Sequence, residues 1–168
     1  MSAFSGVKKL AFGPDDSPVG DDGDPVDTDT CIRLFVNDAF PGRDAGLDGS
    51  GHYSYTEAID VFSGAYSRYN RWRENLAKLA GYPLTADHDG RMMHAAACWN
   101  GATGPFSELI DFADNEGVIG PVVAAKLARD FAEWDERAKA VHGEFYEHYG
   151  DIRRGCDLAA QGGALNFQ

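Results

Sequence analysis

The stretch SGAYSRYNRWRENLAKLAGY, residues 63–82, decides how the chain folds. Its apolar and aromatic residues recur at the spacing of one helix face. These residues are Ala65, Tyr69, Trp72, Leu76 and Leu79. Ser63 is a favourable N-cap residue, and Gly81 followed by Pro83 ends a helix. The sequence therefore predicts an amphipathic helix whose apolar face lies in the core.

The polar side of the same helix carries a basic stripe. Arg68, Arg71 and Lys78 stand at helical spacing in a chain whose formal net charge is −12. We expect this stripe to be a solvated face, with the acidic segment 13–30 as a candidate shield for its charge.

Length and composition predict a single domain spanning residues 1–168. A chain of 168 residues with 43% hydrophobic residues can bury a substantial core, but it is too short for two typical domains. Cys31, Cys98 and Cys156 are far apart and form no CxxC pattern. We interpret them as small buried hydrophobes rather than a disulfide framework or a zinc site.

The acidity of the chain limits its partners. A pI near 4.6 argues against binding to nucleic-acid phosphates or to an anionic membrane surface, but it permits a basic protein partner. No apolar run is long enough to span a membrane, and the N-terminus lacks the apolar core of a secretory signal. We therefore expect a cytoplasmic protein, and we predict no cofactor.

The strand patterns lie in the N-terminal half. KKLAF (8–12) is a candidate short strand, whereas 13–30 is rich in Asp, Pro and Gly and is predicted to be a loop or mobile segment. CIRLFV (31–36), with Phe35 available for burial, and HYSYTEAIDVF (52–62) are predicted to pair in antiparallel fashion. The alternation slips after Tyr55, which indicates a bulge in the second strand.

Helix patterns follow between residues 91 and 141. RMMHAAACW (91–99) is predicted to be a helix with Met92 and Trp99 facing inward. Pro105 and Pro121 each follow a glycine, and proline is favoured at the first position of a helix. The stripe of the helix after Pro121 consists of Val123, Leu127, Phe131, Trp134, Ala138 and Val141.

The C-terminal segment continues the helical pattern. Gly143 is predicted to interrupt or kink the long helix, and a second apolar stripe then runs to residue 159. Its members are Phe145, Tyr149, Ile152, Cys156 and Ala159. ALNF (164–167) is predicted to return as a strand against the N-terminal sheet. The predicted fold is α+β, a small and mostly N-terminal antiparallel sheet packed against about five α-helices that dominate the C-terminal half.

One pair of residues has metal-ligand spacing on a helix. Glu144 and His148 are four residues apart, and Asp151 or Asp111 could supply a third ligand. The alternative is that both are ordinary solvent-facing residues, and we predict no metal site. The run Asp87-His88-Asp89-Gly90 is also rich in ligands, but a turn is the simpler interpretation.

The candidate ligand site is the second polar face of the 63–82 helix. Tyr66, Asn70 and Arg73 share this face, and a phenol, an amide and a guanidinium together suit a planar or anionic small molecule. The acidic turn at residues 114–117 carries Asp114 and Glu116, which we expect nearby. The alternative is a structural clasp in which Arg73 holds Asp111 or Glu116, while Tyr66 and Asn70 cap loop backbone. No catalytic residues are predicted, since neither GxSxG nor HExxH is present.

Three motifs resemble a recurring group of bacterial and prophage-borne proteins. They are residues 63–82, the stretch FSELIDFADNEGVIGPVVAAKLARDF (106–131) and the closing LAAQGGALNF (158–167). The group has no established activity, so the resemblance implies a compact, soluble protein that phages or their hosts encode, and no catalytic residue.

Two hypotheses about function follow. The first is a binding or interaction protein without catalytic machinery, whose partner is a protein. The second is a small-molecule-binding protein or enzyme that uses the Tyr66, Asn70 and Arg73 face with nearby carboxylates.

Overall fold

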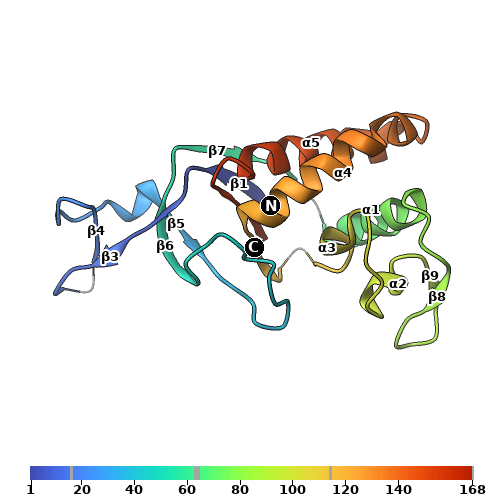
Figure 1. The fold of residues 1–168 in the computed structure, drawn as a ribbon, viewed down its shortest axis with the longest axis horizontal. Coiled ribbons are helices and arrows are strands. Elements are labelled where there is room, and N and C mark those ends of the chain that lie inside the picture. The colour runs from blue at the N-terminus through green and yellow to red at the C-terminus, as the bar shows by residue number, and fades with distance from the viewer. Residues whose placement is uncertain (16, 63–64, 114, 168) are drawn as a thin grey trace.

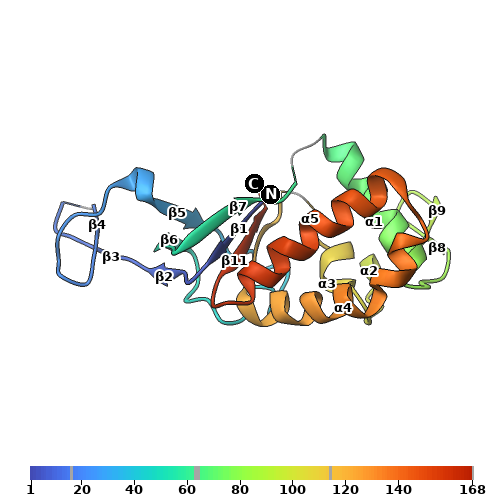
Figure 2. The ribbon, with the colours of Figure 1, turned by 90° about the horizontal axis from the view of Figure 1, so that it is seen from above.

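The fold is α+β, with five α-helices and several small antiparallel sheets in the part of the chain that the computed structural model describes, residues 1–15, 17–62, 65–113 and 115–167. The molecule is elongated, with most of the strands toward one end and the helices toward the other (Figure 1). This separation matters for function because it leaves the helix of residues 66–79 at the end remote from the acidic segment 13–30 (Figures 1 and 2).

The helices dominate the C-terminal half, as the sequence predicts. They are α1 (Tyr66–Leu79), α2 (Ala96–Trp99), α3 (Ser107–Ile110), α4 (Pro121–Lys139) and α5 (Gly143–Ala159). The two longest, α4 and α5, lie side by side along the molecule (Figure 2). Pro121 is the first residue of α4, and the five predicted stripe residues of α5 are all buried, so both predictions are confirmed.

The central sheet has the strand order β10-β11-β1-β7, and its neighbouring strands pair in antiparallel fashion. These strands are β1 (Ser2–Ser5), β7 (Glu57–Asp60), β10 (Gly117–Ile119) and β11 (Ala164–Phe167). Side chains alternate across a strand, so Leu165 and Phe167 join the large core under the helices while Ala164 joins a smaller cluster on the other face. The predicted return of residues 164–167 against the N-terminal sheet is therefore confirmed.

The other strands form three separate small sheets. One has the order β2-β6-β5 and consists of β2 (Lys8–Lys9), β6 (Gly51–Ser54) and β5 (Cys31–Leu34). Its Leu34 and Tyr53 form the smaller cluster with Ala164 and Val118 of the central sheet. The other two are the hairpins of β3 (Ala11–Phe12) with β4 (Pro18–Val19) and of β8 (Thr85–Ala86) with β9 (Met92–Met93).

The core face of α1 is largely as predicted. Tyr69, Trp72 and Leu76 are buried, and the Tyr69 hydroxyl donates to Phe112 O at 3.3 Å. Ala65 is exposed because it is the N-cap residue rather than part of the helix. Ser63, the predicted cap, lies outside the described residues.

The prediction of a helix over 91–99 is wrong for its first half. Met92 and Met93 form β9 and only residues 96–99 are helical, so Met92 is 59% exposed and Trp99 is 39% exposed. The physical reason lies in α1: both Glu74 carboxylate oxygens accept backbone N–H groups, from His94 at 2.9 Å and Ala95 at 2.8 Å. This contact holds the chain in a turn where the sequence pattern alone favours a helix.

One further helix boundary differs from its prediction, and another is confirmed. Pro105 does not begin a helix, because the next residue, Phe106, has a left-handed backbone (φ 59°), and α3 starts only at Ser107. At Gly143 the helical pattern is interrupted rather than kinked, which confirms the first of the two predicted alternatives. The chain ends α4 at Lys139 and begins α5 at Gly143, after His142 with its positive φ.

The predicted strands also need correction. Residues 52–62 do not form one bulged strand: β6 and β7 belong to different sheets, with the break after Ser54. Phe35 is 57% exposed, since β5 ends at Leu34, whose side chain takes the buried position. The pairing of β5 with β6 is confirmed. Among the described residues, no helix has both the length and the apolar character needed to cross a membrane.

Candidate functional site

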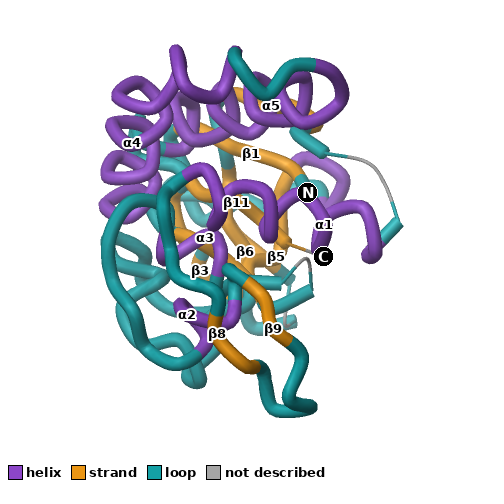
Figure 3. Tube along the Cα trace, turned by 90° about the vertical axis from the view of Figure 1, so that its right-hand side faces the viewer, coloured by secondary structure: helices purple, strands orange, loops and turns teal. Residues whose placement is uncertain are grey.

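The candidate residues on α1 line a hollow of about 490 Å³, which we call the aromatic hollow. Tyr66, Asn70 and Arg73 line it together with Glu116. The other walls come from the loop at Phe40, the β8–β9 hairpin and the end of α2. The helices α1, α2 and α3 and this hairpin lie at the end of the molecule that faces the viewer in Figure 3.

Arg73 anchors the floor of the hollow. Its side chain is 5% exposed, and its Nη1 and Nη2 atoms donate to Ile110 O at 3.0 Å and to Asn70 Oδ1 at 2.5 Å. The guanidinium also lies 5.2 Å from the centre of the Tyr69 ring. Within the described residues, Arg73 pairs with no carboxylate and its Nε has no hydrogen-bond partner. Arg73 therefore forms a clasp with the backbone carbonyl of Ile110. Among the described residues it forms no ion pair with Asp111 or Glu116, the predicted partners.

Asp111 is a partly buried carboxylate of the hollow. It pairs with Arg43 Nη2 at 3.4 Å, and Arg43 also lies over the Phe40 ring at 5.9 Å. Burial raises the pKa of the Asp111 carboxyl above its ordinary value, and Glu116 adds to this increase, while Arg43 and Arg73 oppose it.

Asp111 makes stability depend on pH in a defined direction. Because its pKa is higher in the folded chain, the folded state holds the proton over a pH range, starting at about 4, in which the unfolded chain has lost it. The free energy of unfolding therefore falls as the pH rises through that range. We expect Asp111→Asn to gain stability relative to the wild type as the pH rises above about 4, measured by urea unfolding at a series of pH values.

Asp135 provides the opposite case for comparison. Hydrogen bonding from Lys139 lowers the pKa of its carboxyl, so its contribution to stability is present above the unfolded pKa and disappears as the pH falls. We expect the cost of Asp135→Asn to shrink as the pH falls below about 4. A difference between Asp111→Asn and wild type that stays constant with pH would contradict the raised pKa.

Glu116 is the described member of the predicted acidic turn. Its Oε2 accepts the backbone N–H of Ala113 at 2.5 Å, and its carbonyl oxygen accepts from Asn37 Nδ2 at 3.0 Å. These bonds hold the carboxylate side chain at the wall of the hollow. Asp114, the other predicted carboxylate, lies outside the described residues.

Sequence reasoning missed two aromatic residues of the hollow. Phe40 lies in a Gly- and Asp-rich loop and packs edge-on against Phe112 at 5.0 Å. Trp99, predicted to face the core, instead lines the hollow and donates its Nε1 hydrogen to Ile110 O at 3.4 Å. An aromatic residue inside a polar loop such as NDAFPG is a sequence feature that could have indicated Phe40.

The run Asp87-His88-Asp89 forms the exposed rim of the hollow, at the turn of the β8–β9 hairpin. One oxygen of Asp87 accepts the backbone N–H groups of Asp89 at 2.9 Å and Arg91 at 2.8 Å, as the turn interpretation predicts. The three side chains offer ligand atoms within 4.8 Å of one another. Asp87 is already engaged in stabilising the turn.

Glu144 and His148 belong to α5 and face α1 on the side away from the aromatic hollow. Their Oε1 and Nε2 atoms are 3.5 Å apart, and the same Glu144 oxygen contacts Arg68 Nε at 3.3 Å. No third Asp, Glu, His or Cys joins this pair within the described part of the chain, because Asp111 pairs with Arg43 and Asp151 pairs with Arg154.

The basic stripe is exposed to solvent at Arg68, Arg71 and Lys78, as predicted. Arg68 and Arg71 line a pocket against α5, and the acidic segment 13–30 lies at the far end of the molecule and does not shield them (Figures 1 and 2). The charge partner of Arg68 is Glu144, a residue 76 positions later in the chain that no sequence pattern links to it.

The described cysteines are free thiols. Cys98 and Cys156 are buried, as predicted, whereas Cys31 is only partly buried. Burial raises the pKa of the Cys98 thiol to about 11, so very little nucleophilic thiolate forms near neutral pH. This agrees with the expectation that Cys98 has a packing role.

Comparison with known proteins finds no match, since no protein-family model, no curated protein and no solved structure matches this chain. The resemblance to bacterial and prophage-borne proteins therefore stays a prediction that rests on its three motifs.

Proposed function

We propose that this chain is a binding protein that takes a small planar ligand into the aromatic hollow. The observation that carries the proposal is the hollow itself, in which Tyr66, Asn70 and Arg73 of α1 lie with Glu116 from the turn before β10. Its volume of about 490 Å³ falls within the range of small-molecule sites.

The aromatic lining favours a flat ligand. Tyr66 is 54% exposed and Trp99 is 39% exposed, and Phe40 adds a third ring to the same hollow. Aromatic rings prefer offset or edge-on contact with other rings, and burying an exposed ring is itself favourable. A heteroaromatic ring in the hollow would bury part of these exposed ring surfaces.

The polar groups favour a ligand without phosphate. Four carboxylates and two arginines line the hollow, and the Arg73 donors already bind Ile110 and Asn70. A multiply charged anion would be repelled by this arrangement. A neutral or singly cationic heteroaromatic molecule could instead donate to the carboxylates and accept from Asn70 Nδ2, which has no hydrogen-bond partner among the described residues.

The proposal predicts ligand-dependent stabilisation. We expect at least one free nucleobase, nucleoside or aromatic amine to raise the melting temperature of the full chain, because a ligand at 100 times its dissociation constant stabilises by about 2.7 kcal/mol. Tyr66→Ala should abolish the shift without unfolding the chain, since Tyr66 is 54% exposed.

Phe12→Ala is the matched control. Phe12 is 48% exposed and lies at the opposite end of the molecule, so its loss should leave the shift unchanged (Figure 1). The proposal is rejected if the whole panel leaves the melting temperature unchanged. It is also rejected if Tyr66→Ala and Phe12→Ala respond to the ligand alike.

A further inference from the structure

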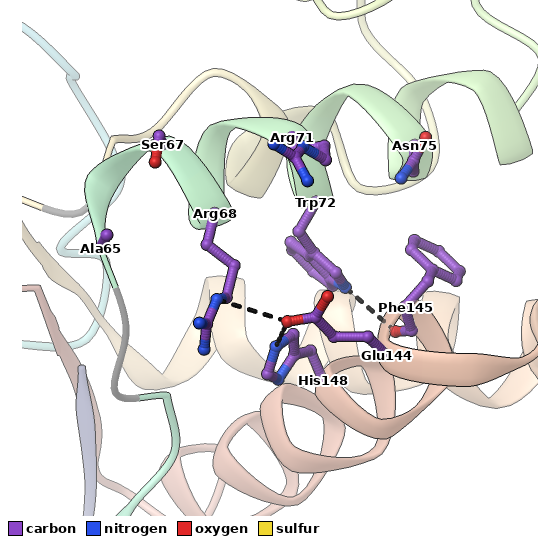
Figure 4. A pocket seen from close by; sticks show the side chains of 9 residues that line it. All are labelled: Ala65, Ser67, Arg68, Arg71, Trp72, Asn75, Glu144, Phe145 and His148. Atoms are coloured by element: carbon purple, nitrogen blue, oxygen red, sulfur yellow. Dashed lines mark hydrogen bonds and ion pairs between the residues drawn. The ribbon is translucent and has the colours of Figure 1, made fainter.

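A second cavity lies on the other side of α1, between its first turns and the start of α5 (Figure 4). Its volume is about 320 Å³, and we call it the α1–α5 pocket. Trp72 and Phe145 contribute its apolar wall and are joined by a hydrogen bond from Trp72 Nε1 to Phe145 O at 3.3 Å. This bond ties the two helices together at the base of the pocket.

The pocket is rich in hydrogen-bond donors. The donor-bearing side chains of its lining are Ser67, Arg68, Arg71, Asn75 and His148. Among the described lining residues, Glu144 is the one carboxylate. In a chain with a net charge of −12, this local excess of positive charge runs against the overall composition.

Glu144 already lies where an anion would bind. Figure 4 shows Arg68 and His148 directed at its carboxylate, with distances of 3.3 Å to Arg68 Nε and 3.5 Å to His148 Nε2. The Glu144 side chain is 62% exposed, and exposed ion pairs of this kind contribute little to stability. Moving this carboxylate out to solvent therefore costs little.

His148 is held more firmly than the Glu144 carboxylate. The His148 ring is 17% exposed and packs edge-on against Phe62 at 4.7 Å, and its buried Nε2 makes no hydrogen bond among the described residues. Arg71 has no ion pair among these residues either, so one guanidinium of the pocket lacks a counter-charge.

The first turn of α1 adds a weaker contribution. The pocket begins at Ala65, the N-cap residue of this 14-residue helix, and Ala65 has no side chain that could cap it. The positive end of the helix dipole therefore adds to the attraction that the arginines exert on an anion.

We propose that the α1–α5 pocket binds a small phosphate-bearing anion, with Glu144 as the resident carboxylate that the anion displaces. Arg68, Arg71 and His148 would donate to the phosphate oxygens, since arginine matches the geometry of such groups. Glu144 sets the affinity, because its negative charge both competes for Arg68 and repels the ligand. This site is separate from the aromatic hollow and does not depend on its function.

The test is a calorimetric titration of the full chain with inorganic phosphate and with phenyl phosphate, at constant ionic strength. We expect Arg71→Gln to weaken binding by about tenfold, which matches the loss of one hydrogen bond between charged groups. We expect Glu144→Gln to tighten binding by a similar factor. Opposite effects from these two substitutions are the signature of a displaced carboxylate.

Lys78→Gln is the matched control, because Lys78 belongs to the same basic stripe of α1 but does not line the pocket. It should bind phosphate as the wild type does, and so should Tyr66→Ala, which tests the aromatic hollow. Equal losses in Arg71→Gln and Lys78→Gln would show general charge attraction and overturn the proposal. Weaker binding by Glu144→Gln would also overturn it, since Glu144 would then be a positioning residue for Arg68.

Discussion

Gly163→Ala is expected to destabilise the fold more than any other single-methyl addition considered for this chain. A Cβ at this position would lie 1.8 Å from Phe4 O and 2.7 Å from Phe4 C, both backbone atoms of β1. Backbone cannot rotate aside as a side chain can, so β1 and β11 would have to separate where Ala164 pairs with Phe4. We expect a loss of about 3 kcal/mol, which lowers the melting temperature by roughly 6–12 °C.

Gly150→Ala is the matched control for this substitution. Gly150 lies within α5, and beyond its chain neighbours and the local helix backbone nothing lies within 4 Å of a Cβ built at this position. Alanine is the better helix former, so we expect a gain of about 0.5–1 kcal/mol. Thermal and urea unfolding of both variants measures the contrast. Equal effects of the two substitutions would mean that β1 and β11 do not approach as closely as the geometry requires.

Phe131→Ala is expected to have the second large effect, a loss of about 3–5 kcal/mol. Phe131 is fully buried, and its ring packs edge-on against Phe106 at 5.0 Å and Tyr149 at 4.7 Å. These rings join α4 to α5 and to the start of α3, so the substitution opens a cavity at the junction of three elements. The Tyr149 hydroxyl still donates to the Phe131 carbonyl, because that bond uses the backbone.

Val122→Ala provides the comparison on the same helix. Val122 is 61% exposed on the outer side of α4, so its truncation should change stability by no more than about 0.5 kcal/mol. Urea unfolding of both variants, fitted with one common dependence of the free energy of unfolding on urea concentration, gives the difference in stability directly. If Phe131→Ala cost no more than Val122→Ala, the aromatic junction would not be the main support of the helical layer.

Sequence patterns located part of the aromatic hollow. Tyr66, Asn70 and Arg73 were predicted to share a helix face, and they line the hollow because helical spacing alone determines which residues point the same way. Glu116 was predicted from an acidic turn and also lines it. Phe40 and Trp99 were not assigned to a site, since no local pattern indicates that these two rings line the same hollow.

The helix over 91–99 shows why local pattern fails in places. Its apolar spacing is helical, yet Glu74 binds the backbone N–H groups of His94 and Ala95 and holds this segment in a turn. A carboxylate 20 residues away outweighs the modest helical preference of the segment, because hydrogen bonds to a charged group contribute about 1.5–3 kcal/mol each.

The sequence by itself determined the two long C-terminal helices, the faces of α1 and the α+β class, because helix periodicity is a local property of the chain. Only the tertiary structure decided the central role of β1, a strand of four residues that is too short to show a pattern. The tertiary structure also decided which cavities lie beside α1. The aromatic hollow and the α1–α5 pocket lie on opposite sides of this helix, and each is completed by residues far from it in sequence. Their proximity follows from long-range packing, which no spacing within one segment encodes.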